Sequence, residues 1–190
     1  MKYIKIPHQF AEDILALYQP SAEIKALTEP EMSPAELVSK ALEAELYSDA
    51  VTFIAHGLPI RESIWWACNC ASQRHDWSQQ ENDAINAAKA WVHTPDETSR
   101  RHAENMAKEA TLDSGAGWAA QAAFWSGGSM TSPKDPVVPP PPYLYAQAVT
   151  GCINLSAILP DGADAKQRFN HFIEIGTDIA NGGNGELEES

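Results

Sequence analysis

Two of the three cysteines lie two residues apart in a tryptophan-rich segment, Leu58–Ala71, with the sequence LPIRESIWWACNCA. Thiolates can bind zinc or carry out redox chemistry. On a helix, however, Cys68 and Cys70 differ by about 200° in direction, so their sulfurs point to nearly opposite faces. A zinc site typically uses C-x₂₋₄-C and two further ligands from another element, and neither His75 nor Cys152 completes such a set. We therefore interpret the three cysteines as reduced, mostly buried thiols, and we expect no metal and no cofactor.

The remaining residues with catalytic potential are scattered. His75 stands beside Asp76 in RHDW, where an enzyme with an unrecognised site could use them together with Glu62. Adjacent residues on a helix do not face each other, and a histidine near a helix C-terminus is more often a partner of the helix dipole. The glycines of residues 126–130, SGGSM, follow a helix rather than precede one, which is typical of a C-cap and turn and not of a phosphate site. The chain has no H-E-x-x-H, G-x-S-x-G, P-loop or dinucleotide-binding motif.

The charge of the chain restricts its partners. There are 26 acidic and 13 basic residues in 190, a formal net charge of −13. Such a surface repels phosphate backbones and anionic lipids, so we expect no nucleic-acid and no membrane binding. No apolar run reaches the about 18 residues of a membrane span, and Pro7 and His8 interrupt the start too early for a signal peptide. We therefore expect a cytoplasmic protein. The negative charge either serves solubility alone or favours a basic protein partner.

The elements that must position these residues are almost all helical. Ser33, Pro34 and Glu36 form a capping box with proline at the first position, and Gly57 is a suitable stop for the helix that follows. The segment with the two tryptophans is apolar almost all round, which predicts a central helix. Helices are predicted for residues 10–18, 33–57, 59–74, 78–95, 94–111, 115–129, 143–160 and 163–182, and residues 21–28 could add another turn or two.

Between two of these helices, residues 130–142 contain six of the 13 prolines and are predicted to run extended along the surface. Strand patterns are nearly absent. We therefore predict an all-α fold, an irregular array of about seven or eight antiparallel or orthogonal helices with one extended Pro-rich link. Residues 1–182 should form a single helical domain, and residues 183–190 a flexible acidic tail.

Three motifs in order resemble a known bacterial family. They lie at residues 58–71 (LPIRESIWWACNCA), 87–107 (AAKAWVHTPDETSRRHAENMA) and 122–157 (AAFWSGGSM…VVPPPPYLYAQAVTGCINLSA). The resemblance is to an uncharacterised family of about this length and covers roughly residues 35–182. It implies no catalytic residues, because its members carry no assigned activity. It also implies a genomic context, because the members tend to be encoded near type VI secretion genes.

These observations lead to a functional hypothesis. We expect a non-enzymatic helical accessory protein that binds another protein, as a type VI secretion adaptor or chaperone for an effector or spike-tip component. The alternatives are an immunity protein that neutralises a toxin and an enzyme with an unrecognised site. The sequence leaves the oligomeric state open. The residues expected to bind the partner are an exposed edge of Trp65 or Trp66, Arg61, and positions in the loop from Ser126 to Tyr143, including Pro139 and Pro140.

Overall fold

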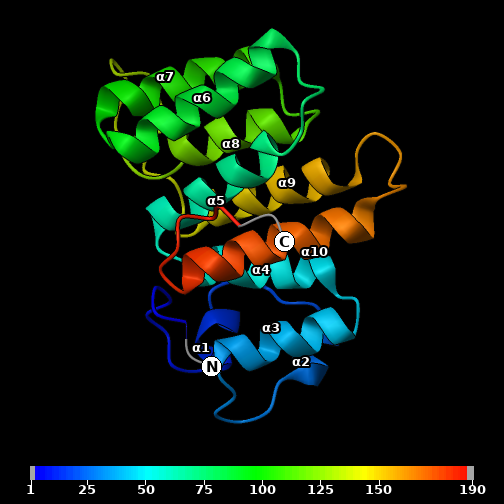
Figure 1. Ribbon diagram of the computed structural model, residues 1–190. Helices are drawn as coiled ribbons and strands as arrows, with labels where there is room; N and C mark the ends of the chain where they lie inside the picture. The colour runs from blue at the N-terminus through cyan, green and yellow to red at the C-terminus, as the bar shows by residue number, and fades with distance from the viewer. Residues whose placement is uncertain (1–2, 188–190) are drawn as a thin grey trace.

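The computed structural model describes residues 3–187, and within them it contains ten α-helices and no strand (Figure 1). The all-α prediction is therefore confirmed, although the helices are more numerous than expected. None of the helices among the described residues has the length and apolar character needed to cross a membrane. The helices are α1 (Ala11–Leu15), α2 (Ala22–Leu27), α3 (Pro34–Glu43), α4 (Tyr47–Gly57), α5 (Ile60–Ser72), α6 (Gln79–His93), α7 (Glu97–Ala110), α8 (Gly115–Phe124), α9 (Leu144–Ile158) and α10 (Ala165–Ala180).

The helices stack in tiers, with α5 in the middle. In Figure 1, α1, α2 and α3 form the lower end, α6, α7 and α8 the upper end, and α4, α9 and α10 lie between them with α5. Helix α5 packs against α4, α6, α8, α9 and α10. A helix with neighbours on every side needs apolar residues around its whole circumference, which is the pattern of the Trp-rich segment. The prediction of a central helix is confirmed.

The single helix predicted over residues 33–57 is wrong, because it breaks into α3 and α4. The predicted capping box is present at the start, where Ser33 N donates to Glu36 Oε2 at 2.9 Å. The break is a Schellman motif: Leu46 N donates to the Ala41 carbonyl at 2.8 Å, and Glu45 N donates to that of Leu42 at 3.1 Å. Glu45 takes the left-handed conformation at φ 58° that glycine usually supplies at this position. The sequence therefore contains no glycine that would mark the end of α3.

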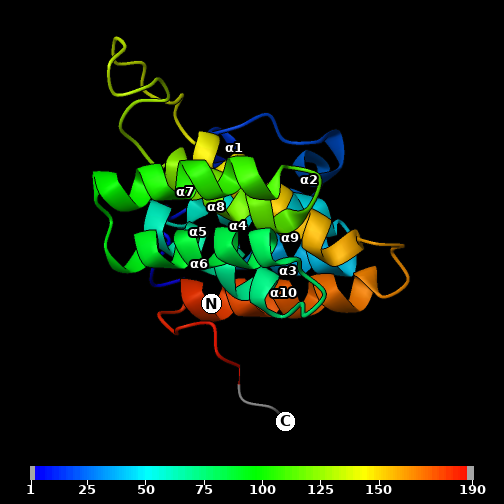
Figure 2. The same ribbon diagram turned by 90° about the horizontal axis from the view of Figure 1, so that it is seen from above.

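The Pro-rich link is free of helix and strand, as expected, but its first part does not follow the surface. Residues 130–138 form a loop that projects from the side of the molecule (Figure 2). Hydrogen bonds close its base, from Met130 N to the Val138 carbonyl at 2.8 Å and from Val138 N to Ser129 Oγ at 3.0 Å. Within the loop, Thr131 Oγ1 donates to the Pro136 carbonyl at 2.7 Å. These bonds turn the chain back on itself where an extended path was expected.

The segment after α10 also differs from expectation. Residues 183–187, predicted to belong to a flexible tail, are hydrogen-bonded to α5 and α10. The Asn184 carbonyl accepts from Trp65 Nε1 at 2.8 Å and from Asn69 Nδ2 at 3.1 Å, and Gly185 N donates to Asp178 Oδ2 at 2.8 Å. The rest of the predicted tail, residues 188–190, lies outside the described residues.

Candidate functional site

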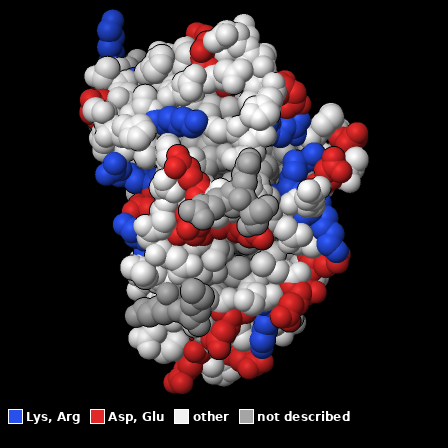
Figure 3. All heavy atoms as spheres, viewed as in Figure 1, with Lys and Arg blue, Asp and Glu red and all other residues white. Residues whose placement is uncertain are grey.

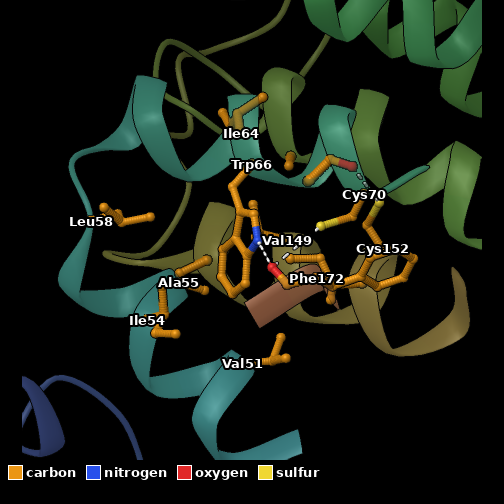
Figure 4. Close-up of a cluster of buried hydrophobic side chains, with 14 of the residues drawn as sticks. Val51, Ile54, Ala55, Leu58, Ile64, Trp66, Cys70, Val149, Cys152 and Phe172 are labelled. Carbon is orange, nitrogen blue, oxygen red and sulfur yellow. Dashed lines mark hydrogen bonds between the residues drawn. The ribbon is translucent and has the colours of Figure 1, made fainter. Parts of the chain in front are cut away.

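Of the two adjacent tryptophans, Trp66 belongs entirely to the core. Its side chain is 0 % exposed, and its indole Nε1 donates to the Phe172 carbonyl of α10 at 2.6 Å (Figure 4). Gly176, one turn further along α10, is where the ring packs closely against that helix: an added Cβ would lie 2.6 Å from Trp66 Cε2. Trp66 therefore offers no edge to a partner, and the expectation that either tryptophan could do so holds only for half-buried Trp65.

The three cysteines are free and buried, as the sequence indicated. Cys152 Sγ lies 3.6 Å from the Ala67 carbonyl and Cys70 Sγ lies 3.9 Å from that of Phe172 (Figure 4). Burial raises the pKa of Cys68 to about 12 and raises the pKa values of Cys70 and Cys152 well above their usual range. Thiols in this state are poor nucleophiles and poor metal ligands. Among residues 3–187, no three His, Cys, Asp or Glu side chains are grouped so that they could hold a metal ion.

The first turn of α5 carries the charged residues of this helix and lies at the surface. Arg61 donates from Nε and Nη2 to the Val92 carbonyl at the end of α6, at 3.1 and 2.7 Å. Glu62 pairs with Lys5, with 3.6 Å between Oε1 and Nζ. Trp65 follows, and its ring and that of His93 meet edge to face, with 5.6 Å between their centroids. The three α5 side chains thus line a hollow of about 330 Å³ between the ends of α6 and α10.

A larger cavity, of about 660 Å³, opens on the other side of this turn. We call it the aromatic cavity. Three segments that are distant in sequence form its walls: the N-terminal segment, the α4–α5 junction and the start of α9. Arg61 and Tyr143, both expected from the sequence to bind a partner, meet here. The lining residues are Pro7, His8, His56, Gly57, Leu58, Pro59, Ile60, Arg61, Glu62, Pro142, Tyr143 and Tyr145.

His56 is the buried polar residue of this cavity. Its ring stacks on Tyr18 at 4.5 Å between centroids and lies 5.9 Å from the ring of Tyr143. Its Nδ1 is 2.7 Å from the Thr52 carbonyl, which can only accept, so Nδ1 carries the proton and Nε2 has a free lone pair. Burial lowers the pKa of His56 and favours this neutral form. Nε2 is buried and has no hydrogen-bond partner among the described residues.

Sequence reasoning missed His56, although a signal was present. It is the only ionisable side chain in the apolar run VTFIAHGLPI, residues 51–60. Tyr143 reaches the cavity because it precedes α9 in the left-handed conformation, at φ 61°. Tyr145 completes the wall at 6.2 Å from it between ring centroids, and burial raises the pKa of Tyr145 to about 12.

The other predicted residues lie on the Pro-rich segment or elsewhere, away from the cavity. Ser126 follows α8, and its Oγ donates to the Ala123 carbonyl at 2.7 Å. Pro139 is exposed and Pro140 half-buried on the segment that leads to α9. Neither proline lines the aromatic cavity.

The residues proposed for an unrecognised enzyme do not form a common site. Glu62 is in the first turn of α5, whereas His75 and Asp76 follow its last turn, about 15 Å or more along the helix axis. Asp76 pairs with Arg74 and not with His75, and this contact lowers the pKa of Asp76. Arg74 in turn donates to the Ser156 carbonyl in the last turn of α9 at 3.1 Å. Arg74 thus ties the end of α5 to α9, and Asp76 pairs with its guanidinium.

Residues 37–180 match a family model described as "Family of unknown function (DUF6931)". The chain belongs to this family. The matched region covers nearly the same residues as the resemblance, 35–182, and it includes α5, the Pro-rich link and two of the three walls of the aromatic cavity. DUF6931 carries no assigned activity or partner. No curated protein and no solved structure is significantly similar to the chain.

Proposed function

We propose that this protein is a non-enzymatic accessory protein that binds another protein through the Pro-rich loop, by which we mean residues 129–142, the projecting loop together with the rest of the Pro-rich link. The observation that carries the proposal is the exposure of two apolar side chains near the end of the loop. Val137 is 77 % exposed and Val138 is 44 % exposed. Covering such exposed apolar side chains with a partner is favourable, because it removes apolar surface from water. Proline restricts the unbound segment, so little conformational entropy is lost on binding.

The base of the loop is fixed, which supports a role in recognition. Arg100 of α7 is buried, and its guanidinium donates to the Phe124 carbonyl at 2.9 Å and to the Ser129 carbonyl at 3.1 Å. Glu97 neutralises this charge at 2.7 Å, and the contact lowers the pKa of Glu97 to about 2. Gly128, at φ 65°, packs against the same guanidinium, where a Cβ would lie 2.8 Å from Cζ. The loop therefore leaves the helices at a defined point, and binding need not order its base.

For the identity of the partner, we propose a type VI secretion component in the cytoplasm, with this protein as its adaptor or chaperone. Support comes from the three motifs at residues 58–71, 87–107 and 122–157, which resemble a family encoded near such genes. The exposed loop fits this role, because an adaptor catalyses no reaction and needs only a surface that binds an apolar segment of its client. The aromatic cavity, bordered by Pro142 at the end of the same segment, offers a second surface nearby.

Affinity purification and mass spectrometry from the native host test both parts. The wild-type chain is compared with the loop variant Val137→Asp/Val138→Asp and with the control Ile158→Asp. Ile158 is an exposed apolar residue at the opposite end of α9, about 20 Å from its start. We expect the wild type and the control to recover the same partner and the loop variant to lose it. Retention by the loop variant would refute the role of the loop, and a partner outside the secretion system would refute the type VI assignment alone.

A second candidate, an immunity protein, is favoured by the charge of the lower tier. Residues 11–50, which include α1, α2 and α3, contain nine acidic and only two basic residues. Figure 3 shows acidic side chains gathered over this end of the molecule. Such a face complements a basic toxin cleft. In co-expression with neighbouring toxins, Glu23→Lys/Glu43→Lys should abolish protection while the loop variant retains it; a charge-reversed variant that still protects would argue against this candidate.

A further inference from the structure

The last part of the Pro-rich loop has a backbone conformation that its own covalent structure fixes. Residues 139–142 are consecutive prolines, and Val138 precedes them. Each proline ring holds φ at about −65°, and a residue that precedes proline takes an extended ψ of about 120–160°. Every φ and ψ between Val138 and Pro142 is restricted in this way, so residues 138–142 follow a polyproline II helix. The structure agrees, because the segment that leads back to α9 contains neither helix nor strand at residues 138–141 (Figure 2).

Two of the three edges of this polyproline II helix face solvent. The helix has three residues per turn, so residues three apart share an edge. Val138 and Pro141 form one exposed edge, and Pro139 and Pro142 form another. Pro140, on the third edge, is half-buried. A partner can therefore cover two adjacent apolar edges while the third faces the protein.

The same prolines exclude two other common ways in which a segment binds a protein. Residues 139–142 have no backbone N–H, so the segment cannot add a strand to the edge of a partner's sheet, and it cannot form a helix that fills a groove. None of the hydrogen bonds among residues 3–187 ends on the carbonyl of Pro139 or Pro140, whereas the Pro141 carbonyl accepts from Leu144 N at 3.2 Å. Two acceptors of the segment thus remain available to a partner.

The charge of the loop narrows the chemistry of the partner. Residues 129–142 contain one lysine and one aspartate, so the loop is neutral in a chain whose net charge is −13. Charge complementarity therefore does not select the partner at this segment. Proline rings pack well on aromatic faces, and polyproline II segments bind in grooves lined by aromatic side chains. Tryptophan and tyrosine supply both the ring and an N–H or O–H donor for a free carbonyl.

We propose that residues 138–142 bind as a polyproline II helix in a groove of the partner protein that is lined by tryptophan or tyrosine rings. The rings cover the two exposed edges, and their N–H or O–H groups donate to the carbonyls of Pro139 and Pro140. This mode of binding rests on the proposed function of the loop and adds the chemistry of the partner's site.

Competition with proline peptides tests the conformation. The immobilised wild-type chain captures its partner from a lysate of the native host in the presence of an L-proline oligomer or of the same oligomer made from D-proline. The L-oligomer forms the left-handed helix of residues 138–142, whereas the D-oligomer is its mirror image with the same composition. We expect the L-oligomer to displace the partner and the D-oligomer to leave it bound. Capture that persists up to the solubility limit of the L-oligomer, or that both oligomers abolish equally, would overturn the proposal.

Matched alanine variants locate the contact once the partner has been purified. Pro139→Ala removes a ring from an exposed edge and Pro140→Ala removes one from the half-buried edge, while both relax the backbone in the middle of the same segment. Isothermal titration calorimetry should show that Pro139→Ala weakens binding about threefold or more beyond the effect of Pro140→Ala, because it alone removes apolar contact area. Equal affinities of the two variants would contradict the proposed orientation of the helix and overturn the proposal.

The outcomes distinguish this mode of binding from the proposed function of the loop. If Val137→Asp/Val138→Asp abolishes capture but the L-oligomer does not compete, the loop binds in another way and only the polyproline II proposal fails. If the same loop variant captures the partner as the wild type does, both fail. A purified chain that dimerises and is dissociated by the L-oligomer would identify a second copy of the chain as the occupant, and it would overturn the proposal of a different partner protein.

Discussion

The contact between Gly176 and Trp66 should reverse the normal effect of a substitution in a helix. Replacing glycine by alanine inside a helix usually stabilises a protein by about 1 kcal/mol. At Gly176 of α10, the new methyl group would lie 2.6 Å from Trp66 Cε2, 2.8 Å from Cζ2 and 2.9 Å from Nε1. Carbon atoms in contact prefer about 3.5–4.0 Å, so either the ring or α10 must move.

The ring has little room to move. Trp66 is 0 % exposed, and its Nε1 is held by the Phe172 carbonyl at 2.6 Å. Overpacking of a close-packed core costs about 1–3 kcal/mol, and three simultaneous short contacts with a rigid ring place this case at the upper end. After the helical gain of about 1 kcal/mol, Gly176→Ala should reduce the free energy of unfolding by about 2 kcal/mol. For a chain of this length, that corresponds to a fall in Tm of about 4–8 °C.

A double-mutant cycle with Trp66→Phe isolates the contact. Phenylalanine lacks the three indole atoms that the methyl group would meet, so in this background Gly176→Ala should stabilise the protein by about 1 kcal/mol. The coupling energy between the two positions is then about 3 kcal/mol. Urea denaturation followed by circular dichroism measures all four proteins. If Gly176→Ala has the same effect in both backgrounds, or stabilises the wild type, the reasoning is refuted.

Three further outcomes follow from His56, Glu45 and the cysteines. Because burial lowers the pKa of His56 from 6.5, the unfolded chain binds a proton that the folded ring does not, and stability should fall as the pH decreases below 6.5. Urea titrations between pH 7 and 5 should show that His56 contributes up to about 1.4 kcal/mol per pH unit to the change in the free energy of unfolding. His56→Phe should lack this contribution, and equal slopes for the two proteins would contradict the prediction. Glu45→Gly should raise stability by about 1 kcal/mol in thermal denaturation, because it relieves the left-handed conformation, whereas Glu45→Ala should not. The three buried thiols should react with Ellman's reagent only after unfolding, and rapid labelling of the native protein would show that burial does not protect them.

The parts of the fold that could be predicted have local causes. The capping box of Ser33 and Glu36 brings together residues three apart, and its side chains suffice to start a helix. The end of that helix at Glu45 was missed because a non-glycine residue there adopts φ 58°, which the packing of α3 and α4 must hold in place. The path of residues 130–138 also escaped prediction, since it depends on hydrogen bonds that join Val138 to Ser129 and Met130, and proline content does not reveal them.

The candidate site was harder to predict, because it depends on which side of a helix faces a neighbour. Trp65 and Trp66 are adjacent and chemically identical, yet the second is enclosed by α10 while the first reaches the surface beside His93. A helix that is apolar all round gives no periodicity from which to choose between them. His56 was overlooked for a similar reason: its aromatic neighbours Tyr18 and Tyr143 are 38 and 87 residues away in sequence.

The N-terminal wall of the aromatic cavity precedes the region matched by the family model, yet it is firmly attached. Lys5 N donates to the Ala180 carbonyl of α10 at 2.8 Å, and Ile6 is buried. The segment also packs closely on Gly57: a Cβ there would lie 3.2 Å from Ile6 Cδ1, and 2.9 Å from Ile14 Cδ1 of α1. Gly57 ends α4, as its position in the sequence suggested, but here its small size also lets the N-terminal segment approach the helix. A Cβ at position 57 would displace the ends of two isoleucine side chains, one in the N-terminal segment and one in α1.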